Sequence, residues 1–107
     1  MINSELAQAR KFVTDRIPRE ELLAQLAEEA AELTHAALKL RRVYDGTNPT
    51  PVEPAQALAS IKEEIADVAL LVQLLELDHP LVEIEGIKNA KLLRWRRRLK
   101  QKEGAKP

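Results

Sequence analysis

Hydrophobic residues recur with helical spacing along most of this chain. In residues 22–40, LLAQLAEEAAELTHAALKL, the leucines at 22, 26, 33 and 40 and the alanine at 37 fall in one sector of a helical wheel. Glu29 projects into the same sector, between Leu26 and Leu33. The pattern therefore predicts a helix with a carboxylate along the side that it should bury.

Hydrophobic spacing along the whole chain predicts four helices and no convincing strand. They cover residues 3–16, from about Pro18 to about Tyr44, from about Ala55 to Leu77, and 81–102. The stretch DGTNPTPVEP (45–54) predicts a loop because it holds one glycine and three prolines, and Asp78-His79-Pro80 ends the third helix. Gly86 is expected to weaken the first turns of the fourth helix.

The predicted fold is all-α, a helical hairpin bundle of about four helices completed by oligomerisation. The second and third helices form the hairpin. Oligomerisation is expected because helices this apolar, in a chain of 107 residues, leave hydrophobic faces uncovered.

Composition predicts one small domain over residues 1–103, with a frayed tail at 104–107. The chain is 45% hydrophobic and has three glycines and no cysteine, which excludes disulfides, zinc–thiolate sites and thiol chemistry. No apolar run approaches the roughly 18 residues of a membrane span. We expect a cytoplasmic protein without a membrane partner.

The net charge is zero, but the charges are unevenly placed. Residues 88–107 contain nine Lys/Arg and one acid, whereas residues 1–87 contain eight Lys/Arg and sixteen Asp/Glu, a net charge of −8. A basic C-terminal end of this kind can bind an anion, such as a phosphorylated substrate or a nucleic acid, or can neutralise the acidic remainder.

Two acidic pairs lie beside the core-facing stripes of the hairpin. Glu29 and Glu32 on one helix, and Glu64 and Asp67 on the other, are three residues apart and therefore neighbours on the helix surface. Four converging carboxylates would repel one another, and burial would penalise their charge, unless a cation were bound. Oxygen ligands without His or Cys favour Mg²⁺, with Mn²⁺ as a substitute, and two ions would balance the charge.

A single glutamate near an apolar stripe is more often a boundary residue whose stem packs while its carboxylate reaches water. Glutamates three residues apart are also common on solvated helices. Two such pairs, each beside a core stripe and joined by one loop, are less common. This combination favours a metal site.

The order Glu28-Glu29-x-x-Glu32 followed by Glu64-x-x-Asp67 resembles the E-E-x-x-E … E-x-x-D signature of the MazG-like, all-α NTP pyrophosphatase superfamily. The segments LAEEAAELTHAALKL and IKEEIADVALLVQLL look like the two metal-binding helices of that family. IKNAKLLRWRRRL is similar to its basic C-terminal helix. The resemblance covers roughly residues 19–100. The spacer between Glu32 and Glu64 is long for the family, which leaves the role of the 45–54 loop open.

The resemblance implies an Mg²⁺-dependent hydrolase that cleaves nucleoside triphosphates between the α and β phosphates, giving the monophosphate and pyrophosphate. It implies that Glu29, Glu32, Glu64 and Asp67 are metal ligands and that Glu28 or Glu63 orients the attacking water. Members of the family assemble into homodimers or dimers of dimers.

The basic C-terminal helix supplies the expected substrate contacts. The resemblance implies that Lys91 and Arg94 meet phosphate oxygens. Arg98 is a further candidate for phosphate binding, and Trp95 could stack on a base. The chain has no glycine-rich phosphate loop, so phosphate must be held by metal and basic side chains.

Two patterns suggest other functions. Glu32…His35 and Glu76…His79 have the spacing of di-iron helix bundles, but His35 points away from the apolar stripe and His79 lies at a helix break. RWRRRLKQK (94–102) could bind nucleic acid. The pattern favours instead a solvated helix that packs inward or across a dimer through Leu92, Leu93, Trp95 and Leu99. The acidic remainder argues against nucleic acid as a partner. The main rival is a non-catalytic helical interaction module whose basic helix binds a protein or nucleic acid.

Overall fold

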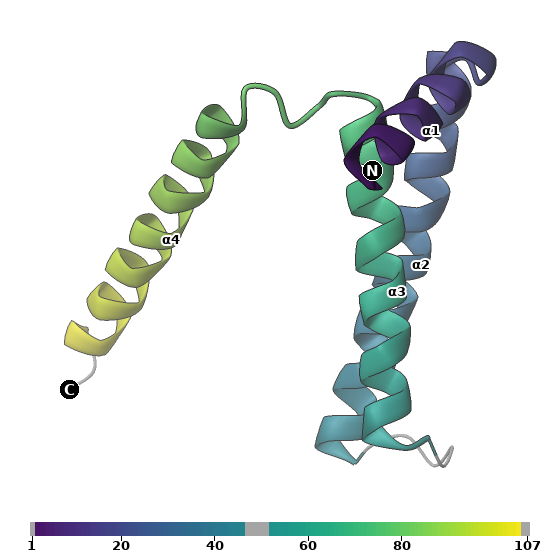
Figure 1. Cartoon of the computed structure of the whole chain (residues 1–107). Helices are drawn as coiled ribbons and strands as arrows, with labels where there is room; N and C mark the ends of the chain where they lie inside the picture. The colour runs from purple at the N-terminus through teal and green to yellow at the C-terminus, as the bar shows by residue number, and fades with distance from the viewer. Residues whose placement is uncertain (1, 47–51, 106–107) are drawn as a thin grey trace. The chain divides into compact units, whose positions relative to one another are not determined.

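The computed structural model describes residues 2–46 and 52–105 and contains four α-helices (Figure 1). They are α1 (Ile2–Arg16), α2 (Arg19–Asp45), α3 (Pro54–Leu74) and α4 (Leu81–Gly104). No strand occurs among these residues, so the all-α prediction is confirmed. The helices fall close to their predicted ranges because the apolar spacing is helical throughout.

Helix α2 begins after Pro18, which holds an extended conformation at the N-cap. Because proline cannot donate a backbone hydrogen bond, it is well placed just before a helix. Its carbonyl accepts hydrogen bonds from the amides of Glu21 and Leu22, at 3.0 and 3.1 Å. Helix α2 ends at Asp45, and its C-cap is Gly46, whose φ of 70° lies in the left-handed region. Half of the predicted 45–54 loop, residues 47–51, lies outside the described residues.

Helix α3 ends at Leu74, three residues before the predicted end. The reason is local, because Glu76 has a φ of 56°, which takes the backbone out of the right-handed helical region. The amide of Leu77 then donates to the carbonyl of Val72 at 3.1 Å. Helix α4 runs two residues beyond its predicted end and continues through Gly86. At the predicted tail, Gly104 is still helical, and residues 106–107 lie outside the described residues.

The core lies between α2 and α3, which run side by side as the predicted hairpin (Figure 1). Leu22, Leu71 and Leu75 form its buried cluster, and Ile17, Leu26 and Leu74 pack against it. Because Ile17 follows directly after α1, this cluster also holds α1 against one end of the hairpin.

The chain divides into two compact units, residues 1–77 and 78–107. The first holds the hairpin with α1, and the second is essentially α4, which has no buried residue. The expectation of one domain over residues 1–103 stays a prediction. Among the described helices, none combines the length and hydrophobicity that crossing a membrane requires.

Candidate metal centre and basic groove

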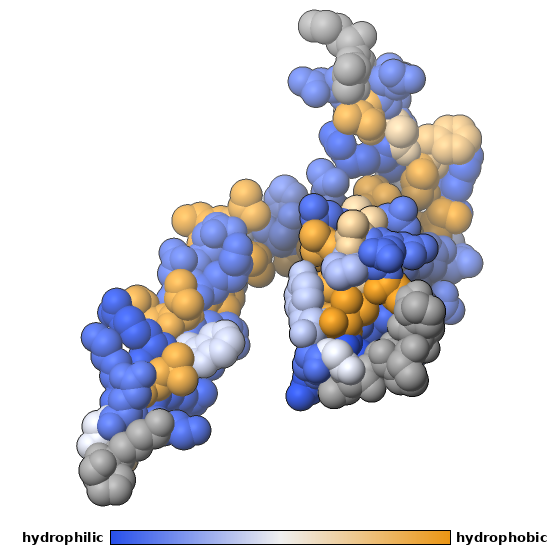
Figure 2. Space-filling model, turned by 90° about the horizontal axis from the view of Figure 1, so that it is seen from below, coloured by the Kyte–Doolittle hydropathy of each residue, from blue (hydrophilic) through white to orange (hydrophobic). Residues whose placement is uncertain are grey.

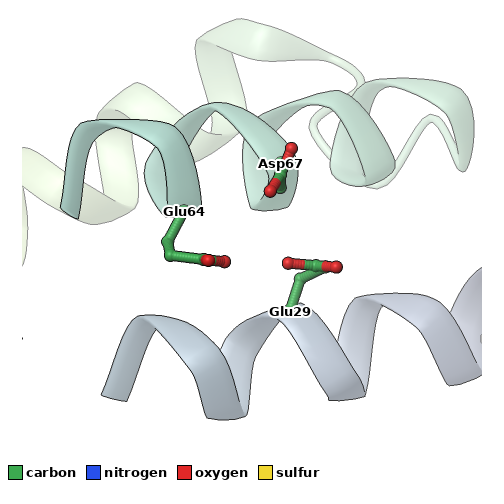
Figure 3. A group of neighbouring side chains, drawn as sticks. All are labelled: Glu29, Glu64 and Asp67. Carbon is green, nitrogen blue, oxygen red and sulfur yellow. The ribbon is translucent and has the colours of Figure 1, made fainter. Parts of the chain in front are cut away.

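Three carboxylates from two helices meet in the middle of the hairpin. Glu29 extends from α2 toward Glu64 and Asp67 of α3 (Figure 3). One carboxylate oxygen from each residue lies within 4.8 Å of the other two. Glu64 and Asp67 are neighbours on the surface of α3 because they are three residues apart on one helix. The antiparallel partner helix supplies the third carboxylate from the opposite side.

This acidic cluster (Glu29, Glu64 and Asp67) is partly withdrawn from water. Glu29 and Glu64 are half-buried, and Asp67 is exposed. Within the described parts of the chain, the Oε2 atom of Glu64 is enclosed and has no hydrogen-bond partner. An enclosed carboxylate oxygen without a donor is costly, because it has given up hydration without replacement.

The cluster also disturbs the ionisation of Glu29. A side-chain hydrogen bond with Glu64 raises the pKa of Glu29 to about 7 from its ordinary value of 4.5. Partial loss of hydration adds to this effect, as do the negative charges of Glu64, Asp67 and Glu32. Near neutral pH, Glu29 is therefore protonated part of the time. The proton relieves the repulsion among the carboxylates of the acidic cluster, and a bound cation would relieve it in the same way.

The other predicted acids lie around this cluster rather than in it. Glu32 was expected to be a fourth converging ligand, but it is exposed and lies outside the group of three. It is near enough for its charge to raise the pKa of Glu29. Glu28 and Glu63, the candidates for orienting water, are both exposed, one on each helix.

On α4, the four predicted substrate contacts share one groove. Lys91, Arg94, Trp95 and Arg98 line a groove of about 370 Å³ together with Leu99 and Lys102. Trp95 is 65% exposed, so its ring is available to a ligand. We call this surface the basic groove. Sequence reasoning missed Lys102, although it stands one helical turn after Arg98.

The two histidines take no part in the acidic cluster. His35 and His79 are exposed, and Nε2 of His79 lies 3.8 Å from Oδ1 of Asp78. Among the described residues, the one group with the spacing of a metal site contains only carboxylates. The structure therefore offers no set of ligands resembling a di-iron centre in the part that it describes.

The donor atoms of the acidic cluster determine which cation it can bind. Three carboxylates, with no nitrogen or sulfur donor, match hard divalent cations such as Mg²⁺ and Mn²⁺. Three protein ligands would leave coordination positions for water and for phosphate oxygens.

Comparison with known proteins found no match among protein-family models, curated proteins or solved structures.

Proposed function

We propose that this chain is an Mg²⁺-dependent nucleoside triphosphate pyrophosphohydrolase. It would convert NTP or dNTP to the monophosphate and pyrophosphate, in the cytoplasm and as a homo-oligomer. The proposal is carried by one observation, the meeting of Glu29, Glu64 and Asp67 across the hairpin. The resemblance of the acidic motif to MazG-like enzymes supplies the reaction.

The residues present fit a divalent cation. The enclosed Oε2 atom of Glu64 has no hydrogen-bond partner in the described structure, and the pKa of Glu29 is raised to about 7. Both features are what a cation site shows when its carboxylates face one another directly. Glu29, Glu64 and Asp67 would hold the ion, with Glu32 at the edge, near enough to add negative charge. When bound, Mg²⁺ supplies a Lewis acid that makes water easier to deprotonate and offsets phosphate charge.

The side chains of the chain itself would do the remaining work. Glu28 and Glu63, both exposed, would orient the attacking water and accept its proton. Lys91, Arg94 and Arg98 would donate charge-assisted hydrogen bonds to phosphate oxygens and stabilise the pyrophosphate leaving group. Trp95 would stack on the base. The reaction requires no Ser, Cys or His nucleophile.

Product analysis tests this proposal. The protein is incubated with each NTP and dNTP, with Mg²⁺ or with a chelator, and the products are separated by anion-exchange chromatography. We expect monophosphate and pyrophosphate, formed only with the metal. Diphosphate and inorganic phosphate would contradict the proposed bond cleavage.

Variants connect the activity to the acidic cluster. Glu64→Gln keeps the size of the side chain but removes its charge, and should lower kcat/KM by about 100-fold or more. Glu5→Gln, an exposed glutamate on α1, is the matched control and should leave the activity unchanged. Equal activity in both variants would remove the acidic cluster from the mechanism.

One observation favours a second candidate function, a non-catalytic interaction module. Helix α4 has no buried residue, and Leu92 and Trp95 are each 65% exposed among basic side chains. Hydrophobic and hydrophilic residues are interspersed over the visible surface of the helix (Figure 2). If the protein hydrolyses no nucleotide and Glu64→Gln leaves metal binding unchanged, the interaction module is the better account and the pyrophosphohydrolase proposal is wrong.

A further inference from the structure

Helix α4 exposes large apolar side chains. Among its described residues none is buried, and the unit to which it belongs, residues 78–107, contains no other helix. Leu92 and Trp95 are each 65% exposed, and Leu99 is 52% exposed. Large apolar side chains that gather on one surface mark a site of interaction. The position of these three residues around the helix decides whether they form such a surface.

The three side chains form a single ridge. Trp95 follows Leu92 by three positions, and Leu99 follows Trp95 by four, so all three lie within about 60° around the helix axis. We call Leu92, Trp95 and Leu99 the apolar ridge. Leu93 is also apolar, but it lies about 100° further round the helix from Leu92 and away from the ridge.

Basic side chains flank the apolar ridge on both sides. The basic groove lies along one side. A second groove of about 560 Å³ contains Arg96 and Lys100, which lie on the other side of the helix. Trp95 and Leu99 line both grooves and therefore stand between them. The ridge is an apolar strip with positive charge along each edge.

The segment that carries the ridge is strongly positive. Residues 86–102 contain eight Lys/Arg and no Asp/Glu. The whole chain is neutral, but exposed charges are largely screened beyond about 8 Å at physiological ionic strength. A surface in contact with α4 therefore experiences the local positive charge rather than the net charge of the chain. The partner that fits is anionic and also accepts apolar side chains.

We propose that α4 docks on an anionic phospholipid membrane, parallel to its surface, with the apolar ridge inserted among the upper parts of the acyl chains. Basic amphipathic helices with Trp and Leu on their apolar side bind membrane interfaces in this orientation. The lysines and arginines along the edges of the ridge extend toward the lipid phosphates. Trp95 lies at the boundary between headgroups and acyl chains, the depth that tryptophan prefers.

The apolar ridge favours a lipid surface over a nucleic acid. A helix in the major groove of a duplex contacts phosphates with its flanking residues and base edges with its central residues, largely through hydrogen bonds. Between its basic edges, α4 presents Leu92 and Leu99, whose side chains can neither donate nor accept hydrogen bonds. Acyl chains take up these side chains at no cost in hydrogen bonds.

The proposal concerns binding at a lipid surface and not passage across it. The expectation of no membrane partner rests on the lack of an apolar run of spanning length, and none of the described helices could cross a membrane. An interfacial helix needs no such run, because only one side of it enters the lipid. The proposal does not depend on nucleotide hydrolysis.

Trp95 is the only tryptophan of the chain, so its fluorescence reports on the ridge itself. The full chain is mixed with vesicles of phosphatidylcholine, or of phosphatidylcholine and phosphatidylglycerol in equal amounts, at physiological ionic strength and without nucleotide. With the anionic vesicles we expect the emission of Trp95 to shift to shorter wavelength and to be quenched by lipids brominated in their acyl chains. With phosphatidylcholine alone we expect neither change.

Leu92→Glu and Leu93→Glu are a matched pair, because the two leucines are adjacent and exposed and receive the same charge. In co-sedimentation with the anionic vesicles, Leu93→Glu should weaken binding by about fivefold, the effect of one charge near the surface. Leu92→Glu should weaken it by at least about 50-fold, because it also places a charge among acyl chains. Circular dichroism without vesicles should be the same for both variants.

Three results would overturn the inference. They are no binding to the anionic vesicles, binding that leaves Trp95 unquenched by brominated lipid, and equal weakening by the two substitutions. A labelled DNA duplex serves as the alternative partner, and binding to the duplex without binding to vesicles would assign α4 to nucleic acid instead. Nucleotide hydrolysis is measured without vesicles, so failure of the membrane proposal is distinct from failure of the proposed function.

Discussion

At the scale of single residues, Glu29 shows how helix geometry creates the site. It lies on the core-facing sector of α2, so the facing helix brings Glu64 and Asp67 toward it. Glu32, one turn later, is rotated by about 60° and remains at the edge. The sequence predicts which acids lie near the seam, because that follows from spacing. It does not predict which of them meet, because that depends on the pairing register of two helices.

The raised pKa of Glu29 predicts a pH dependence of stability. Its pKa is 4.5 ordinarily and about 7 in the folded chain, so folding favours the protonated form. Between these values the folded state holds more protons than the unfolded state, and stability from this group is lost as pH rises through about 7. Urea unfolding from pH 4 to 8 without divalent metal should show this slope, and Glu29→Gln should flatten it.

The pH dependence should reverse when metal is present. Mg²⁺ competes with the proton at Glu29, so its binding should strengthen as pH rises through about 7 and should stabilise the folded chain most above that value. A pH slope that is the same in wild type and Glu29→Gln, with or without Mg²⁺, would contradict this explanation.

Neutralising the charge of Asp67 should increase the stability of the folded chain in the absence of metal. Its charge raises the pKa of Glu29, and its own side chain is exposed, so it contributes repulsion without packing. Asp67→Asn should raise the melting temperature in chelator and lower the stabilisation that Mg²⁺ provides. Differential scanning calorimetry measures both effects. A large loss of stability in chelator would show instead that Asp67 forms a structural interaction.

At the scale of elements, the ends of the helices separate what the sequence predicts from what it does not. Proline and glycine mark both ends of α2, which begins directly after Pro18 and ends directly before Gly46. The early end of α3 follows from the left-handed conformation of Glu76, a residue type that gives no such signal in the sequence. Hydrophobic periodicity through Leu75 and Leu77 predicted a longer helix, because periodicity reports burial rather than backbone conformation.

Two glycines should respond oppositely to alanine. Gly46 has a φ of 70°, where a Cβ atom is strained, so Gly46→Ala should destabilise the hairpin by about 1 kcal/mol. Gly86 lies within α4, where an added methyl group would meet open space, so Gly86→Ala should increase the helicity of α4. Thermal unfolding followed by circular dichroism tests both variants. An unchanged midpoint for Gly46→Ala would contradict the first expectation.

Arginine substitutions on different sides of α4 should affect nucleotide hydrolysis differently, because only one side carries the basic groove. Arg94 lines the groove, whereas Arg96 does not. Arg94→Ala should lower kcat/KM for nucleotide by about 10–100-fold, the effect of losing a charge-assisted hydrogen bond. Arg96→Ala removes the same charge from another side and should have a much smaller effect. Equal losses in the two variants would indicate a general charge effect instead of a site.

At the scale of the whole molecule, opposite charges reside on separate units. Residues 1–77 contain thirteen Asp/Glu and eight Lys/Arg, whereas residues 78–107 contain four Asp/Glu and nine Lys/Arg. The acidic unit contains the candidate metal ligands, and the basic unit contains the candidate phosphate contacts. Composition predicts this division. It cannot predict that each unit leaves apolar residues exposed, because that depends on which helices pack together.

The metal affinity of the acidic cluster is the central claim. Mn²⁺ bound to the protein is silent in solution electron paramagnetic resonance relative to free Mn²⁺. Titration of the chain with Mn²⁺ at pH 7.5 therefore measures binding directly. Glu64→Gln is the test variant, and Glu5→Gln is its matched control. We predict saturable binding to wild type and Glu5→Gln, weakened by about 10–100-fold or more in Glu64→Gln. Equal affinity in all three proteins would contradict the claim that Glu29, Glu64 and Asp67 form a metal centre.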